Sequence, residues 1–166
     1  SGEIDNIPFL KFLAKKNLRT ILSTGMSTLP EIDSAIKILL KNGLQKKNLV
    51  LMQCTSAYPT PFEEANLKVL EYYKTKYHLN VGLSDHTPGI ISPIVSVGFG
   101  ARLIEKHFTL SKKMKGPDHK ASLDPKELKN LVTSLRIAEK LLGSDKKNVT
   151  KREKKNKTLS RKSIFA

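Results

Sequence analysis

Residues 81–108, VGLSDHTPGIISPIVSVGFGARLIEKHF, place a segment of helical period between two short apolar runs. The runs are 81–84 and 102–108, and the segment between them is 89–99. Short apolar runs bounded by turn residues and polar groups are typical of buried strands. Parallel strands need a crossover connection, which is usually a helix. This stretch therefore predicts one β-α-β unit.

The same alternation continues through most of the chain. Two further apolar runs predict strands, and four further segments predict helices. They are 19–23 and 49–55 for the strands, and 7–16, 29–42, 62–76 and 125–142 for the helices. Four successive βα units predict an α/β fold with a parallel sheet buried by helices.

Three of the predicted helices begin with capping residues. Thr60 and Asp124 are each followed by Pro at the next position and by Glu three residues later, and Thr28 has the same spacing to Glu31. A capping side chain and a following carboxylate satisfy the free N–H groups of a first helical turn. We therefore expect Thr60 to cap the helix at 62–76.

Every predicted strand ends in hydroxyl or ionisable groups: Ser23-Thr24-Gly25, Thr55-Ser56, Ser84-Asp85-His86 and His107-Phe108-Thr109. Barrels collect such groups from several strand ends at once, whereas an open doubly wound sheet concentrates its site at one switch point. The chain also has neither a dinucleotide-binding glycine fingerprint nor a P-loop. The pattern favours half of a (β/α)8 TIM barrel over an open sheet.

Length and composition bound the kind of protein. A chain of 166 residues suits a single core. One cysteine cannot form an internal disulfide and no leader segment precedes the first helix, so we expect a cytoplasmic location. The longest uncharged stretch, 87–101, is shorter than the about 20 residues of a membrane span and is broken by Pro and Gly. We expect no membrane association.

Much of the net charge of +15 lies in residues 146–162, which hold nine basic residues and one acidic residue, Glu153. A polar run without apolar periodicity predicts a solvated linker or tail, 146–166, after a folded domain, 1–145. A basic rim that attracts substrate and a nucleic-acid-binding segment are the alternatives. No aromatic side chain interleaves the basic ones before Phe165, so we expect no nucleic-acid partner.

Two histidines lie at the carboxyl ends of neighbouring predicted strands. Ser84 and His86 share one strand face, as do Glu105 and His107, because strand side chains alternate. If both faces point into a barrel mouth, the two imidazoles converge. With oxygen ligands from substrate and water they would suit Mn²⁺ or another divalent ion. A hydrogen-bonded structural histidine at each position is the alternative.

Three other candidates have structural alternatives of their own. The sequence Gly116-Pro117-Asp118-His119 is either a third ionisable cluster or only a turn. The sequence Tyr58-Pro59-Thr60-Pro61 lies near the predicted site, or is only a rigid loop that leads into a helix. Cys54, in the middle of an apolar run, is expected in the core.

Six motifs occur in the order found in the N-acetylneuraminate (sialic acid) synthase family, which this chain resembles over about residues 1–145. They are Ser1-Gly2-Glu3, Leu22-Ser23-Thr24-Gly25-Met26, the segment from Gln53 to Pro61, Gly82-Leu83-Ser84-Asp85-His86-Thr87, the segment from Ile104 to Thr109, and Gly116-Pro117-Asp118-His119. The resemblance implies a TIM-barrel enzyme. It would condense phosphoenolpyruvate with N-acetylmannosamine or a related amino sugar, forming a nine-carbon 2-keto acid and phosphate.

The resemblance also implies roles for individual residues. His86 and His107 match ligands of a divalent metal ion, which we expect to be Mn²⁺, with Mg²⁺ or Co²⁺ possible; the ion would polarise the sugar aldehyde. Four serines match donors to phosphoenolpyruvate: Ser1, Ser23, Ser56 and Ser84. Glu3, Tyr58 and Asp118 match catalytic positions on the sugar side, where carboxylates bind hydroxyls or move protons.

Relative to that family, the chain corresponds to the second half of the barrel, from the end of strand 4 through helix 8. The family continues into a small antifreeze-like domain and forms homodimers. We therefore expect a fragment that is inactive alone and is part of a homodimeric enzyme. The alternatives are another phosphoenolpyruvate-dependent aldol-type barrel enzyme, and an inactive fragment that acts as an assembly or binding module through its exposed sheet edges.

Overall fold

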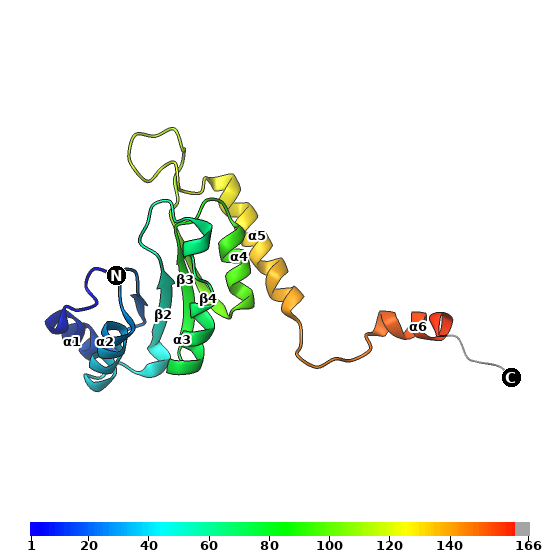
Figure 1. Cartoon of the computed structure of the whole chain (residues 1–166), viewed down its shortest axis with the longest axis horizontal. Coiled ribbons are helices and arrows are strands. Elements are labelled where there is room, and N and C mark those ends of the chain that lie inside the picture. Colours follow the sequence, from blue (N-terminus) through cyan, green and yellow to red (C-terminus); the bar gives the residue numbers. More distant parts are fainter. Residues whose placement is uncertain (162–166) are drawn as a thin grey trace.

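The computed structural model describes residues 1–161, apart from the side chains of residues 158 and 159. Its centre is a parallel sheet of four strands in the order β1-β2-β3-β4 (Figure 1). The strands are β1 (Thr20–Ser23), β2 (Leu49–Cys54), β3 (Asn80–Asp85) and β4 (Ala101–Lys106). All neighbours pair in parallel, which confirms the predicted α/β sheet of consecutive βα units.

Helices connect the strands and continue beyond them. They are α1 (Ile7–Lys16), α2 (Leu29–Lys41), α3 (Val69–Tyr77), α4 (Ile91–Gly98), α5 (Pro125–Leu142) and α6 (Lys151–Ser160), with short 3₁₀ turns η1 (Lys46–Asn48) and η2 (Phe62–Glu64). Two predicted caps are present. The Glu31 carboxylate accepts the Thr28 N–H at 2.6 Å, and the Asp124 carboxylate accepts the Glu127 N–H at 2.8 Å.

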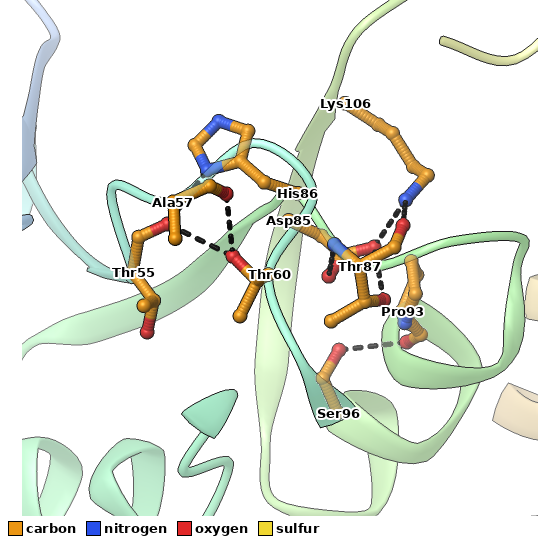
Figure 2. A network of polar contacts seen from close by, with 9 residues as sticks. All are labelled: Thr55, Ala57, Thr60, Asp85, His86, Thr87, Pro93, Ser96 and Lys106. Atoms are coloured by element: carbon orange, nitrogen blue, oxygen red, sulfur yellow. Dashed lines mark hydrogen bonds and ion pairs between the residues drawn. The ribbon is translucent and has the colours of Figure 1, made fainter. Parts of the chain in front are cut away.

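The predicted helix at 62–76 is wrong in its first half. The chain makes the short turn η2 there, then Asn66 takes a positive φ of 49°, and α3 begins only at Val69. Thr60 is not a cap, because its buried hydroxyl donates backwards to the carbonyls of Thr55, at 3.2 Å, and Ala57, at 2.8 Å (Figure 2). The hydroxyl closes the loop after β2 instead of starting a helix.

The side chains of the basic segment that the structure describes are exposed, and part of the segment is helical rather than irregular. Thr150 and Glu153 form a capping box, with the Glu153 carboxylate 2.8 Å from the Thr150 N–H, and this starts α6 without any apolar face. Figure 1 shows α6 apart from the sheet, beyond the end of α5. Lys162, at the end of the predicted basic run, and Phe165 lie outside the described residues.

The main core lies between one face of the sheet and helices α1, α2 and α3. Leu22, Leu51 and Val81 point to this side, and Leu39 and Leu70 from the helices pack with them. Ile21, which alternates to the other face, is 50% exposed. Side chains on the helix-covered face of β1, β2 and β3 are therefore buried in a core, whereas the opposite face of β1 is exposed to solvent. No helix within residues 1–161 is both long and apolar enough to cross a bilayer.

Candidate active site

Most of the predicted site residues lie at or just after the carboxyl ends of the four strands, which lie at one edge of the sheet. β1 ends at Ser23 and β2 at Cys54, while β3 and β4 end one residue before His86 and His107. The carboxyl edge is where parallel α/β folds place their ligands. Side chains far apart in the sequence therefore meet there.

The two histidines converge, as the alternation of strand side chains predicts. The ring centroids of His86 and His107 lie 5.3 Å apart in an edge-to-face arrangement. The two residues directly follow adjacent strands, β3 and β4, whose last residues Asp85 and Lys106 are register partners. This geometry confirms their proximity, and their role as ligands stays a prediction.

The hydrogen bonds of His86 determine its tautomer. Its Nδ1 lies 2.8 Å from the backbone carbonyl oxygen of Thr55, which can only accept, so Nδ1 carries the proton. The Thr60 N–H donates to the His86 carbonyl at 2.9 Å and holds the backbone at the same place. In the neutral ring, Nε2 then keeps its lone pair. A ring N–H donated to a carbonyl is the usual arrangement of a metal-ligating histidine.

Tyr58 and Asp118 lie beside the histidine pair. The ring centroid of Tyr58 is 4.2 Å from that of His86 and 5.5 Å from that of His107. Partial desolvation raises the pKa of the Tyr58 phenol, and electrostatic repulsion from Cys54, Asp118 and Glu105 raises it further, so the phenol stays protonated at neutral pH. The Asp118 carboxylate, on the loop after β4, has Oδ2 3.9 Å from His107 Nδ1.

Three of the four predicted serines gather at the ends of β1 and β2. The hydroxyls of Ser1 and Ser23 lie 2.9 Å apart. Gly25 has no side chain between them: a Cβ there would collide with Ser56 Oγ and lie 2.8 Å from Ser1 Oγ. Ser56 and Cys54 also line a cavity of about 750 Å³ between α2 and α3, and Cys54 is buried as expected.

Ser84, the fourth predicted serine, is hydrogen-bonded to Glu105 rather than to the other serines. Its buried hydroxyl donates to the Glu105 carboxylate at 2.7 Å, and the two residues are direct partners in the β3–β4 register. The sequence places Glu105 on the face of His107 but does not single it out. The missing signal is the pairing register of the two strands, which brings this carboxylate to Ser84.

Glu3 stands apart from these groups. It lies in the turn before α1, where its carboxylate accepts a hydrogen bond from the Asn6 side chain at 2.6 Å. Among the contacts of the described residues, none joins Glu3 to Tyr58 or Asp118. Its catalytic role stays a prediction.

The donor set suits a metal ion with few protein ligands. Within residues 1–161, no group of three or more His, Cys, Asp or Glu side chains is placed to hold an ion. Two imidazole ligands leave most coordination positions to non-protein oxygen atoms, as in sites where a divalent ion meets its substrate. His86, with its Nε2 lone pair available, fits this arrangement.

Comparisons with known proteins identify the family of this chain. A model of the NeuB family matches residues 1–147. A protein named N,N'-diacetyllegionaminic acid synthase from Campylobacter jejuni is 51% identical over 166 residues, covering 100% of this chain and 50% of the relative. A protein of the same name from Legionella pneumophila is 48% identical, covering 99% and 47%.

Human N-acetylneuraminate-9-phosphate synthase is 39% identical over 150 residues, covering 90% of this chain and 41% of the relative. The crystal structure of the N-acetylneuraminic acid (sialic acid) synthetase of Leptospira borgpetersenii, in complex with citrate, superimposes with a TM-score of 0.85 at 36% identity, covering 95% of this chain and 54% of that one. The chain spans about half the length of the curated relatives it matches. From the family match and the shared fold, the chain belongs to the NeuB family.

Proposed function

We propose that this chain forms the second half of the catalytic barrel of a synthase that condenses phosphoenolpyruvate with an N-acetylated amino sugar. The reaction consumes water, releases phosphate and yields a nine-carbon 2-keto sugar acid. The observation that carries the proposal is the convergence of His86 and His107 at the carboxyl edge. The activity belongs to a protein of the relatives' length, called the full-length enzyme below, which we propose is a cytoplasmic homodimer.

The serine cluster would hold phosphoenolpyruvate. Ser1, Ser23 and Ser56 present short hydroxyls around Gly25, where the absence of a side chain leaves room for an oxyanion to approach closely. Hydroxyls that donate to carboxylate or phosphate oxygens form charge-assisted hydrogen bonds. Ser84 joins them only if the anion displaces Glu105 from its hydroxyl, because a serine has one proton to donate.

The histidine pair would hold the divalent ion, for which we propose Mn²⁺, with Mg²⁺ or Co²⁺ as alternatives. When bound, such an ion polarises the aldehyde oxygen of an open-chain sugar as a Lewis acid. His86 is oriented for this role by its bond to the Thr55 carbonyl. Tyr58, with a phenol that stays protonated, donates a hydrogen bond to a sugar oxygen, and the exposed Asp118 carboxylate accepts one or moves a proton. Glu3 is assigned to the sugar side by resemblance alone.

The sugar is the finer part of the proposal. The two relatives named N,N'-diacetyllegionaminic acid synthase are 51% and 48% identical to this chain, against 39% for a pseudaminic acid synthase and for human N-acetylneuraminate-9-phosphate synthase. This ranking supports the diacetamido sugar that leads to a diacetyllegionaminic acid as the substrate. N-acetylmannosamine is the second candidate, supported by the structural likeness to a sialic acid synthetase.

The test is phosphate release by the full-length enzyme with phosphoenolpyruvate, Mn²⁺ and a panel of sugars. The panel holds a 2,4-diacetamido hexose, N-acetylmannosamine and its 6-phosphate, and a plain aldose such as erythrose 4-phosphate. We expect release with the diacetamido sugar first and N-acetylmannosamine second. Release only with the plain aldose would contradict the proposal and support the alternative, another phosphoenolpyruvate-dependent aldol-type barrel enzyme.

A further inference from the structure

Asp85 and Lys106 form a buried ion pair at the ends of β3 and β4, next to the two histidines in the sequence. Lys106 Nζ lies 2.5 Å from Asp85 Oδ2, with 4% and 2% of the two side chains exposed. Asp85 is the residue before His86, and Lys106 is the residue before His107. No other ion pair within the described residues is buried to this degree.

Stability alone is a weak reason for such a pair. Removing two charges from water costs several kcal/mol per ion, and apolar replacements of a buried pair are often neutral or stabilising. A pair of this kind is favourable only when its geometry is fixed and every polar atom is satisfied. Both conditions are met here. Lys106 also donates to the Thr87 carbonyl at 2.6 Å, and Asp85 accepts from the Thr87 N–H at 3.1 Å and hydroxyl at 3.2 Å (Figure 2).

The placement of these bonds constrains His86 and His107. Asp85 and Lys106 are direct partners in the β3–β4 register, and side chains alternate along a strand, so the ion pair lies on one face and the histidines emerge on the other. Lys106 bonds to residues on both sides of His86, namely Asp85 and Thr87. The link therefore fixes how far apart the backbones of the two histidines lie.

We propose that Asp85 and Lys106 are positioning residues that set the separation of His86 and His107 for a shared divalent ion. The inference rests on the proposed function, because it needs the histidines to be ligands. Neither residue touches the substrate side of the sheet, and each acts through the backbone of its neighbouring histidine. Partners that orient metal ligands alter metal affinity by about 10- to 100-fold when they are replaced.

The test compares Mn²⁺ affinity, measured by titration calorimetry, with the melting temperature of the full-length enzyme. The double variant Asp85→Asn with Lys106→Met removes both charges and leaves no buried ion unpaired. We expect Mn²⁺ to bind about 10- to 100-fold more weakly to it, with a melting temperature close to that of the unmodified enzyme. The matched control is Asp33→Asn with Lys76→Met, which removes the ion pair between α2 and α3. We expect that control to bind Mn²⁺ normally.

A second variant covers the case in which the double variant does not fold. Lys106→Arg keeps the charge but carries a larger, planar head group, which shifts the two strand ends. We expect it to fold and to bind Mn²⁺ more weakly, with a loss toward the lower end of the range of about 10- to 100-fold. Affinity within about twofold of normal in a folded variant overturns the inference, and so does failure of both variants to fold, which would assign the pair to stability.

The proposed function fails separately. If the unmodified enzyme binds no Mn²⁺, or binds it equally well after His86→Ala and His107→Ala, then the histidines are not ligands. If Mn²⁺ needs the histidines but ignores the ion pair, only the positioning role is wrong.

Discussion

The ends of β1 and β2 hold their polar side chains differently from the ends of β3 and β4. At β1 and β2, the hydroxyls of Ser1 and Ser23 contact each other at the surface, and Ser56 faces them across Gly25. At β3 and β4, His86 is bonded to the Thr55 carbonyl and lies between two residues tied to a buried lysine.

This difference matches the two kinds of ligand proposed for the site. A hydroxyl can rotate its proton toward whichever oxygen of an anion comes near, so it needs little fixation. A metal bond requires the lone pairs of two rings to point at one position, so their backbones must be fixed. The hydroxyl donors at one end of the edge have protons that can rotate, and we call them the mobile donors. The imidazole donors at the other end are held by a hydrogen bond and a buried ion pair, and we call them the rigid donors.

Removing a rigid donor is expected to have the largest effect. His86→Ala or His107→Ala in the full-length enzyme should lower kcat/KM by at least about 10³-fold, since the charge stabilisation supplied at the reacting carbonyl is lost. For His86→Ala the free energy of unfolding should fall by only about 1 kcal/mol, the value of the bond to Thr55. Steady-state kinetics and denaturant titration measure both. Activity within about tenfold of normal in both variants contradicts the assignment.

Removing a mobile donor should act on one substrate only. A hydrogen bond to a charged group contributes about 1.5–3 kcal/mol, so Ser23→Ala should raise the KM for phosphoenolpyruvate about 10- to 150-fold and leave that of the sugar unchanged. Ser27→Ala is the matched control, because its hydroxyl faces the Gly25 carbonyl of its own loop. We expect a smaller effect for Ser84→Ala, whose hydroxyl already donates to Glu105. A defect selective for the sugar would reverse the two ends of the site.

The space around Gly25 can be tested without removing a donor. In Gly25→Ala the new methyl group collides with Ser56 Oγ, so the hydroxyls must separate. We expect the KM for phosphoenolpyruvate to rise about tenfold, as for one lost charge-assisted bond. Gly2→Ala, where a Cβ meets nothing within 4 Å, serves as the control. Equal kinetics in the two variants would mean that the cluster binds no anion.

The smallest expected effect concerns an ion pair between Lys112, on the loop that carries Asp118, and Glu127 in α5. The Lys112 ammonium holds the pKa of Glu127 below its ordinary value of 4.5, and the Asp124 N–H lowers it further. This stability is present above the unfolded-state pKa and is lost as the pH falls through the lower folded-state pKa. Since the pair is about one-third exposed, its contribution is below about 1 kcal/mol.

Melting temperatures measured from about pH 5 downward test the Lys112–Glu127 ion pair. The unmodified protein should lose stability over this range faster than Glu127→Gln, and Lys112→Met should flatten the same part of the curve. Parallel curves for all three would show that the contact does not form in solution.

The sequence predicts the parts of the fold that local physics determines. The helices at 7–16 and 125–142 agree with α1 and α5 at both ends, because a cap and a proline mark each start and Asn17 or Gly143 follows each end. Thr60 has an equally good capping pattern, yet its hydroxyl bonds to carbonyls that precede it. That choice depends on how the loop folds back, which local spacing does not encode.

The same limit applies to the site. Alternation in neighbouring parallel strands predicts that His86 meets His107 if both side chains point to the same face of the sheet. The Ser84–Glu105 and Asp85–Lys106 pairs depend on the register of β3 and β4, which shifts between Val81 and Gly82. Such an irregularity comes from packing between strands rather than from either strand alone, so these contacts become visible only in the structure.

The most direct test of the account is the position of the metal ion itself. Crystals of the full-length enzyme grown with Mn²⁺ should give an anomalous difference peak bonded to Nε2 of both His86 and His107, with Nδ1 of His86 still on the Thr55 carbonyl. A peak held by only one of the two histidines, or one elsewhere on the carboxyl edge, would contradict the central claim that these two strand ends form a rigid metal site.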